Sequence, residues 1–126
     1  MQIPGVDSPI TGWGLPSDED ALLPLNFATP RLVASQVVKT GPGILYGLTV
    51  SNTLAATQYV QVFDAATLPA DGAVPILSKL LTASDATGFN WLPGRTFLTG
   101  IVVCNSSTQS TKTLGSANCL FDVQFI

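Results

Sequence analysis

The chain has 126 residues, which suits one domain with enough length for a hydrophobic core. Apolar residues make up 46% of it and charged residues only 10%, against about 25% in ordinary globular proteins, so part of the surface is expected to be hidden in an assembly. The net charge of −3 argues against nucleic acid as a partner, and no apolar run approaches the roughly 20 residues that cross a bilayer. The N-terminus lacks the basic and apolar regions of a signal peptide, so we expect synthesis in a cytoplasm.

Residues 1–30 are predicted to form an extended arm outside the domain. Five prolines block helices and interior sheet positions there, namely Pro4, Pro9, Pro16, Pro24 and Pro30. Apolar side chains are nevertheless frequent, whereas a disordered tail would be depleted in them. We therefore expect the arm to dock on a partner through Ile3, Val6, Ile10, Trp13, Leu22, Leu25 and Phe27. The alternative is that residues 20–30 form the first strand region of the domain.

Residues 31–126 alternate between predicted strands and turns. Strands are expected over residues 31–39, 43–52, 57–65, 74–82, 89–95, 96–105 and 118–126, with the turn clusters TGPG, LPADGAVP and ASDATG between some of them. No stretch keeps the 3.6-residue apolar period of a helix for long. The sequence predicts an all-β domain of about seven antiparallel strands, arranged as a β-sandwich or jelly roll.

Several of these strands are apolar on both faces, although a sheet in a soluble monomer usually shows water one polar face. In GILYGLTVSN, alternation places Ile44, Tyr46, Leu48 and Val50 on one face and small, weakly polar residues on the other. In TFLTGIVVC, Phe97, Ile101 and Val103 face one way, and Leu98, Val102 and Cys104 face the other. We expect a sister subunit, in a dimer or trimer, or another partner to cover the second face. The expected subunit interface consists of Tyr59, Phe63, Phe97, Ile101 and Val103.

No residue pattern indicates an active site, and we expect no catalytic residue, cofactor or metal ion. The chain has no histidine, which excludes Ser-His and Cys-His nucleophile pairs and histidine metal ligands. The acidic cluster at residues 18–20 lacks the pattern of a calcium loop. Asp64 and Asp71 flank a loop, where capping of turns is a commoner role than that of glycosidase carboxylates.

The two cysteines, Cys104 and Cys119, fit neither a zinc spacing nor a redox Cys-x-x-Cys pair. We expect two buried thiols that pack as small hydrophobic side chains. The alternative is a disulfide between neighbouring strands of one hairpin, where both side chains would face the same way.

Five segments between residues 38 and 126 carry a resemblance to known proteins. They are LYGL with Tyr46 and the following Asn52, QYVQVFDA with Gln61, Phe63 and Asp64, LPADGAVP, TGIVVCNS, and CLFDVQF. Together they resemble small all-β structural proteins of tailed bacteriophages, which decorate the capsid or belong to the head or the tail. FLTGI and Cys104 depart from that pattern, and the arm lies outside it. The resemblance implies a compact β-domain on the virion surface and provides no catalytic residue.

This resemblance leads us to expect a non-enzymatic capsid decoration or cement protein that binds the major capsid protein. The arm would lie along neighbouring shell subunits and stabilise the assembled shell by binding it. One alternative is a virion protein associated with the tail, the baseplate or a fibre. An alternative of a different class is a lectin-like carbohydrate-binding module, in which Trp91 or Tyr59 would contact glycans. Neither a nucleic acid nor a membrane is expected as a partner.

Overall fold

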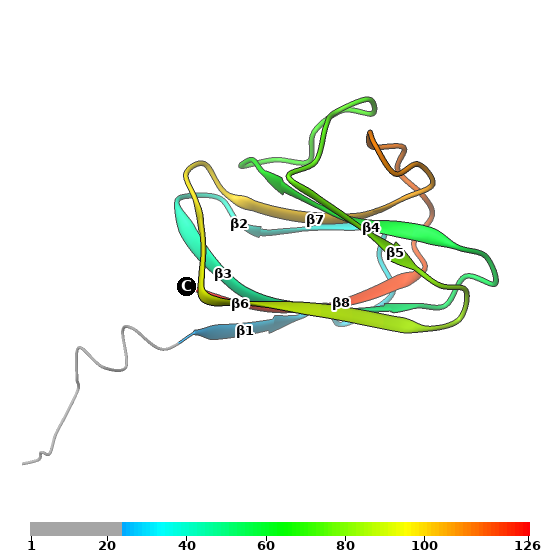
Figure 1. Ribbon diagram of the computed structural model, residues 1–126, viewed down its shortest axis with the longest axis horizontal. Helices are drawn as coiled ribbons and strands as arrows, with labels where there is room; N and C mark the ends of the chain where they lie inside the picture. Colours follow the sequence, from blue (N-terminus) through cyan, green and yellow to red (C-terminus); the bar gives the residue numbers. More distant parts are fainter. Residues whose placement is uncertain (1–23) are drawn as a thin grey trace, which may run out of the picture.

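The computed structural model describes residues 24–126, which form two antiparallel sheets packed face to face (Figure 1). The eight strands are β1 (Leu25–Ala28), β2 (Ser35–Lys39), β3 (Gly43–Asn52), β4 (Gln58–Asp64), β5 (Leu77–Leu81), β6 (Ala86–Phe97), β7 (Ile101–Ser106) and β8 (Cys119–Phe125). Sheet A has the strand order β1-β8-β3-β6, and sheet B has the order β2-β7-β4-β5. The predicted all-β sandwich is confirmed, with eight strands in place of about seven. Within the described residues no helix could span a bilayer.

The main core lies between the two sheets. It is formed by alternate, inward-facing residues of the central strands, such as Leu48 and Val50 of β3, Val60 and Val62 of β4, and Val123 of β8. These side chains have almost no solvent exposure. Burial of one such side chain contributes about 1.5–3 kcal/mol, so this layer supplies most of the stabilisation of the sandwich.

A bulge in β3 changes which residues of this strand face the core. The register of β3 with β8 shifts between Leu45 and Gly47, which leaves Tyr46 as an extra residue, and opposite Tyr46 the residues 91–94 of β6 are left out of the pairing. An extra residue reverses the alternation, so Leu45 before the bulge and Leu48 after it share the inner face. The expectation that Ile44 and Tyr46 share a face with Leu48 and Val50 is therefore wrong. Ile44 and Tyr46 are half-buried.

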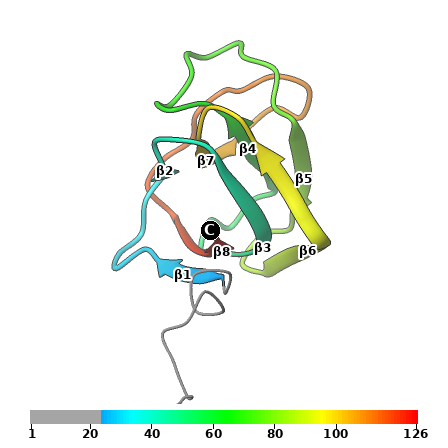
Figure 2. The same cartoon turned by 90° about the vertical axis from the view of Figure 1, so that its left-hand side faces the viewer.

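Loops of the same chain cover the part of the outer face of sheet B around β7 (Figures 1 and 2). Phe63, Val102 and Cys104 form a second buried cluster on this face, packed against side chains of β2, of residues 65–73 and of Leu114. Both faces of β7 are thus buried, as its sequence requires. The cover, however, is the chain itself, and no sister subunit is needed to exclude water from β7.

Four of the five residues expected at a subunit interface are buried within a single chain, so this expectation is wrong for them. Phe97, Ile101 and Val103 have 0% exposure within one chain and belong to the main core, and Phe63 is 4% exposed beneath the loops. None of the four leaves a surface for a second copy. Tyr59 is half-buried on the outer face of sheet B, paired across strands with the exposed Leu80.

Two side-chain amides of sheet B anchor the Ser- and Thr-rich loop, Gln61 on the outer face of the sheet and Asn105 on the inner face. Gln61 is fully buried, and its Nε2 donates to the carbonyl oxygens of Thr108 at 2.9 Å and Gln109 at 3.1 Å. Asn105 donates from Nδ2 to the carbonyl oxygen of Ser116 at 2.8 Å and accepts the backbone N–H of Gly115 at 3.0 Å. The loop is thereby anchored through polar contacts to its main chain.

Strand β1 lies within the segment expected to be an arm. It pairs antiparallel with β8, with Leu25 opposite Phe125 and Phe27 opposite Val123. Residues 25–28 are therefore part of sheet A, as the alternative for residues 20–30 anticipated, and Phe27 is half-buried in the domain. The other expected arm contacts lie outside the described residues, namely Ile3, Val6, Ile10, Trp13 and Leu22. The acidic cluster at residues 18–20 lies outside them as well.

The two cysteines lie in different layers of the molecule. Cys104 belongs to β7 in sheet B and packs beneath the loops, whereas Cys119 opens β8 in sheet A and faces the main core. Both are free and buried, as the thiol interpretation predicts. The disulfide alternative fails because β7 and β8 do not form one hairpin.

Candidate functional site

The carboxylates of Asp64 and Asp71 hold loops in place. Asp64 accepts the backbone N–H groups of Leu98 at 3.0 Å, Thr99 at 2.8 Å and Gly100 at 3.2 Å, and these hydrogen bonds, that of Leu98 first, lower its pKa. Asp71 forms an ion pair with the buried Lys112, whose hydrogen bond lowers the pKa of Asp71. Residues 24–126 contain no group of three or more cysteine or carboxylate side chains placed to hold a metal ion.

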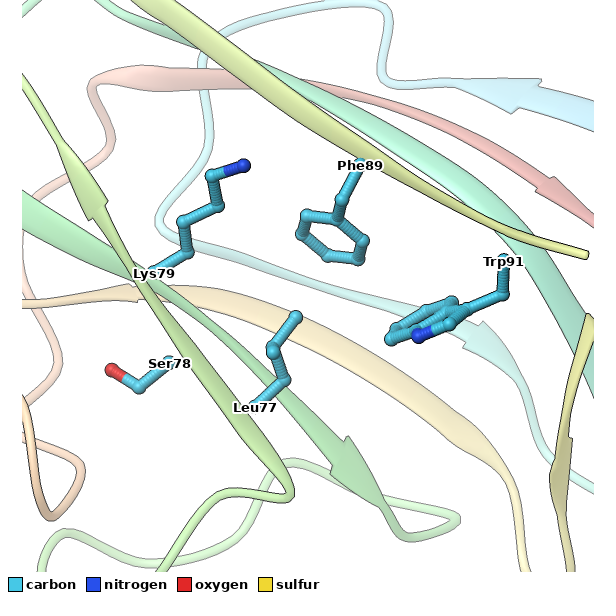
Figure 3. Close-up of a pocket in the computed structure, with 5 residues that line it drawn as sticks. All are labelled: Leu77, Ser78, Lys79, Phe89 and Trp91. Carbon is cyan, nitrogen blue, oxygen red and sulfur yellow. The ribbon is translucent and has the colours of Figure 1, made fainter.

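An apolar groove opens on the side of the sandwich where β5 and β6 lie at the edges of their sheets. We call it the β5–β6 groove; its volume is about 220 Å³, and it is lined by Leu77, Ser78, Lys79, Phe89 and Trp91. The rings of Phe89 and Trp91 meet edge to face, with centroids 4.9 Å apart (Figure 3). Lys79 Nζ donates to the Gly88 carbonyl at 2.8 Å and lies 5.7 Å from the centroid of the Phe89 ring.

A second hollow, lined mainly by apolar surface, lies on the outer face of sheet A. Asn26, Gln124, Gly47 and Asn90 stand in register across β1, β8, β3 and β6, so all four share this face. We call it the amide hollow; its volume is about 330 Å³, and it is lined by Pro24, Tyr46, Gly47, Asn90, Trp91, Leu92 and Gln124. A further hollow of about 250 Å³ lies along the same face, lined in part by Thr49, Ser51 and Asp122.

Gly47 forms the floor of the amide hollow. A Cβ atom at this position would lie 2.6 Å from Asn90 Oδ1 and 3.0 Å from Gln124 Oε1. The two amide side chains therefore lean over Gly47 from the neighbouring strands. Any larger residue at position 47 would push them apart and fill the hollow.

The rim of the amide hollow is apolar. Tyr46 protrudes at the β3 bulge and packs against Gly94, where φ is +113° and a Cβ atom would lie 2.6 Å from Ile44 Cγ2 and 2.9 Å from Tyr46 Cε1. Leu92 is 94% exposed beside it. Trp91 lines both the β5–β6 groove and the amide hollow, so the two sites adjoin at this residue.

Sequence reasoning identified only part of this surface. Of the two aromatic residues considered as glycan contacts, Trp91 lies at the junction of the two hollows, and Tyr59 lies on sheet B. The amides of Asn26, Asn90 and Gln124 were missed. Each occupies an outward position of its strand, but which strands neighbour each other cannot be read from the alternation.

Comparison with known proteins gives little. No family model and no curated protein matches the sequence. Among solved structures, the chain is similar to the coat protein of Tobacco streak virus, with 9% sequence identity and a TM-score of 0.41, over 80% of this chain and 84% of that chain. A likeness this distant carries no functional assignment to the present protein.

Proposed function

We propose that the protein is a non-enzymatic structural component of a tailed bacteriophage virion, which decorates the capsid and stabilises the boundaries between shell subunits. The resemblance of residues 38–126 to phage structural proteins and the low content of charged residues support this role. The partner would be the major capsid protein, and the location would be the capsid surface, after synthesis in the bacterial cytoplasm.

One structural observation supports the proposal more than the others. The N-terminal segment joins the domain at Pro24, which lines the amide hollow together with Tyr46, Trp91 and the almost fully exposed Leu92. A contiguous apolar surface of this kind is typical of interaction sites. The proposed arm would leave the domain beside this surface and contact the shell.

Stabilisation of the shell follows from mass action. A protein that binds only the assembled shell lowers its free energy, by about 2.7 kcal/mol per site when the free concentration is 100 times the dissociation constant. Association of the decoration protein with itself, as a dimer or trimer, would raise this effect through multivalency. Of the expected interface, the fold leaves Tyr59 at the surface, beside the exposed Leu80.

The first experiment is the copy number of the protein in purified particles, by quantitative mass spectrometry against the major capsid protein. A fixed ratio to the shell subunit over the whole lattice supports capsid decoration. A copy number at the level of a tail, baseplate or fibre component supports the alternative virion location. Absence from the particle refutes a virion role of either kind.

The role of the arm is tested by deleting residues 2–23. A longer deletion would remove β1 and its pairing with β8, so loss of binding could then reflect damage to sheet A. We expect the shorter variant to keep the far-ultraviolet spectrum and unfolding midpoint of the domain and to lose capsid binding in a sedimentation assay. Binding equal to that of the full chain would refute the arm's role.

A further inference from the structure

We propose that the amide hollow on the outer face of sheet A binds a neutral saccharide. Neither the decoration role nor its alternatives at the tail require such a site. It would give the virion surface an affinity for glycans.

The polar groups of the hollow form an ordered row. Gln124 Nε2 donates to Asn26 Oδ1 at 2.6 Å and to Asp122 Oδ1 at 3.1 Å. Among the described residues, Gln124 Oε1, Asn26 Nδ2 and the whole Asn90 amide have no hydrogen-bond partner. A primary amide offers two donors beside an acceptor with two lone pairs. The row thus presents donors and acceptors side by side, and adjacent sugar hydroxyls, each of which both donates and accepts, match this arrangement.

The charge of the hollow selects against ionic ligands. All seven lining residues are uncharged, and Asp122, the carboxylate linked to the row, is already an acceptor for Gln124. A phosphate or carboxylate group would find no cation here to compensate for the loss of its hydration. A neutral polyol needs none, and the unpartnered amide atoms replace its bonds to water.

The apolar rim complements the polar row. Tyr46 contributes aromatic surface, and Pro24 and Leu92 contribute aliphatic surface around Asn90, while Trp91 also lines the hollow although its ring packs on Phe89 in the β5–β6 groove. A sugar ring has apolar C–H faces and polar edges, so it fits a site that combines aromatic walls with a few placed hydrogen-bonding groups. The volume of about 330 Å³ lies at the lower end of the range for small-molecule sites, roughly 300–1,000 Å³, which suits a short saccharide.

The site is also preorganised. Gln124 is fixed by two hydrogen bonds, the Tyr46 ring packs on Gly94, and Gly47 keeps the floor open. Among the three amides of the row, only Asn90 has no hydrogen bond that orders its side chain, which limits the ordering that opposes binding of a small ligand.

The test is a ¹⁵N-NMR titration of the full chain with methyl glycosides of glucose, galactose and mannose and with N-acetylglucosamine. We expect at least one sugar to shift the side-chain amide signals of Asn90 and Gln124 and the indole N–H of Trp91 in a saturable way, with a dissociation constant on the order of millimolar. Asn90→Ala and Gln124→Ala should each weaken binding about 2–10-fold, the equivalent of one hydrogen bond. Gln109→Ala is the matched control, because it removes an exposed glutamine side chain from the loop over sheet B.

Gly47→Ala provides a second variant, because its methyl group would displace the Asn90 and Gln124 amides and abolish binding. Unchanged backbone signals outside the hollow would show that each variant folds. No saturable shift with any of the four sugars overturns the proposal, as do shifts that persist in the Asn90 and Gln124 variants.

Two other occupants of the hollow would be recognised in the same spectra. If the hollow signals change on dilution of the sugar-free protein, a second copy covers this face. If they change on deletion of residues 2–23, the N-terminal segment covers it. Either result, without a sugar response, overturns the saccharide site and leaves the copy-number test of the virion role unaffected.

Discussion

The substitution Phe63→Ala tests whether the chain itself or a second copy covers the outer face of sheet B. Phe63 packs with Val102 and Cys104 beneath Leu68 and Leu114, and only 4% of it is exposed. If the cover belongs to the same chain, the substitution must lower the free energy of unfolding of the single chain at any protein concentration. If the cover is a second copy, the loss must depend on concentration.

The magnitude follows from the burial. A Phe-to-Ala change in a core costs about 3–5 kcal/mol, through lost transfer free energy and the cavity left behind. Because the cover consists of loops, which relax more easily than strands, we expect a value near 3 kcal/mol. A domain of this size is stable by roughly 5–15 kcal/mol, so the variant should remain folded but clearly weakened.

The assay is equilibrium unfolding in urea at two protein concentrations, followed by tryptophan fluorescence. With a slope of about 2 kcal/mol per molar urea, a loss of 3 kcal/mol lowers the midpoint by roughly 1.5 M. Leu98→Ala is the control, since Leu98 is 76% exposed and its loss should change stability by no more than about 0.5 kcal/mol. A loss below about 1 kcal/mol for Phe63→Ala, or a midpoint that moves with protein concentration, would refute the reasoning.

Three further predictions concern single positions. The N–H groups of residues 98–100 lower the pKa of Asp64. The contribution of this carboxylate to stability is therefore complete above the unfolded pKa of about 3.9 and is lost as the pH falls through the folded pKa. In acid unfolding curves, the Asp64→Asn variant should lose less stability with falling pH than the parent protein. Burial raises the pKa of Cys104 to about 12, so at neutral pH the folded protein should react with a thiol reagent far more slowly than the protein unfolded in urea. The contribution of this thiol to stability should fall as the pH rises above about 8.5, the pKa of a cysteine in the unfolded chain. Gly94→Ala should lower the melting temperature more than Gly72→Ala: both glycines have positive φ, but only Gly94 would also clash, with Ile44 and Tyr46. Equal melting temperatures for the two glycine variants would contradict the clash.

The alternation of side chains predicted the layers of β4 and β7 correctly. Val60 and Val62 face the main core, and Phe63 faces the other way, as their spacing requires. The sequence also indicated that both faces of β7 need burial. It could not indicate what covers the second face, because the covering loops at 65–76 and 107–118 are polar, Gly-rich or Pro-rich and show no periodic pattern.

Two local features of sheet A could not be predicted from the alternation of apolar residues. The extra residue at Tyr46 reverses the alternation within β3; the adjacent Gly47 is a residue type that often marks a bulge, but it does not show which residue is extra. Similarly, FNWLPGR was predicted to be a short strand with its own turn, whereas it belongs to the longer edge strand β6, in which residues 91–94 are left out of the pairing with β3. The amide hollow depends on both features, since Tyr46 and Leu92 form its rim, and it was therefore missed.

The way the loop over sheet B is anchored has a consequence for engineering. Gln61 and Asn105 bind this loop through main-chain atoms of Thr108, Gln109, Gly115 and Ser116, so these contacts do not depend on the side chains at those four positions. The exposed positions 109 and 110 can therefore be exchanged, or extended by an inserted peptide, while the two buried amides keep their partners. The fold thus provides a display platform, with a rigid β-sandwich base and a replaceable tip.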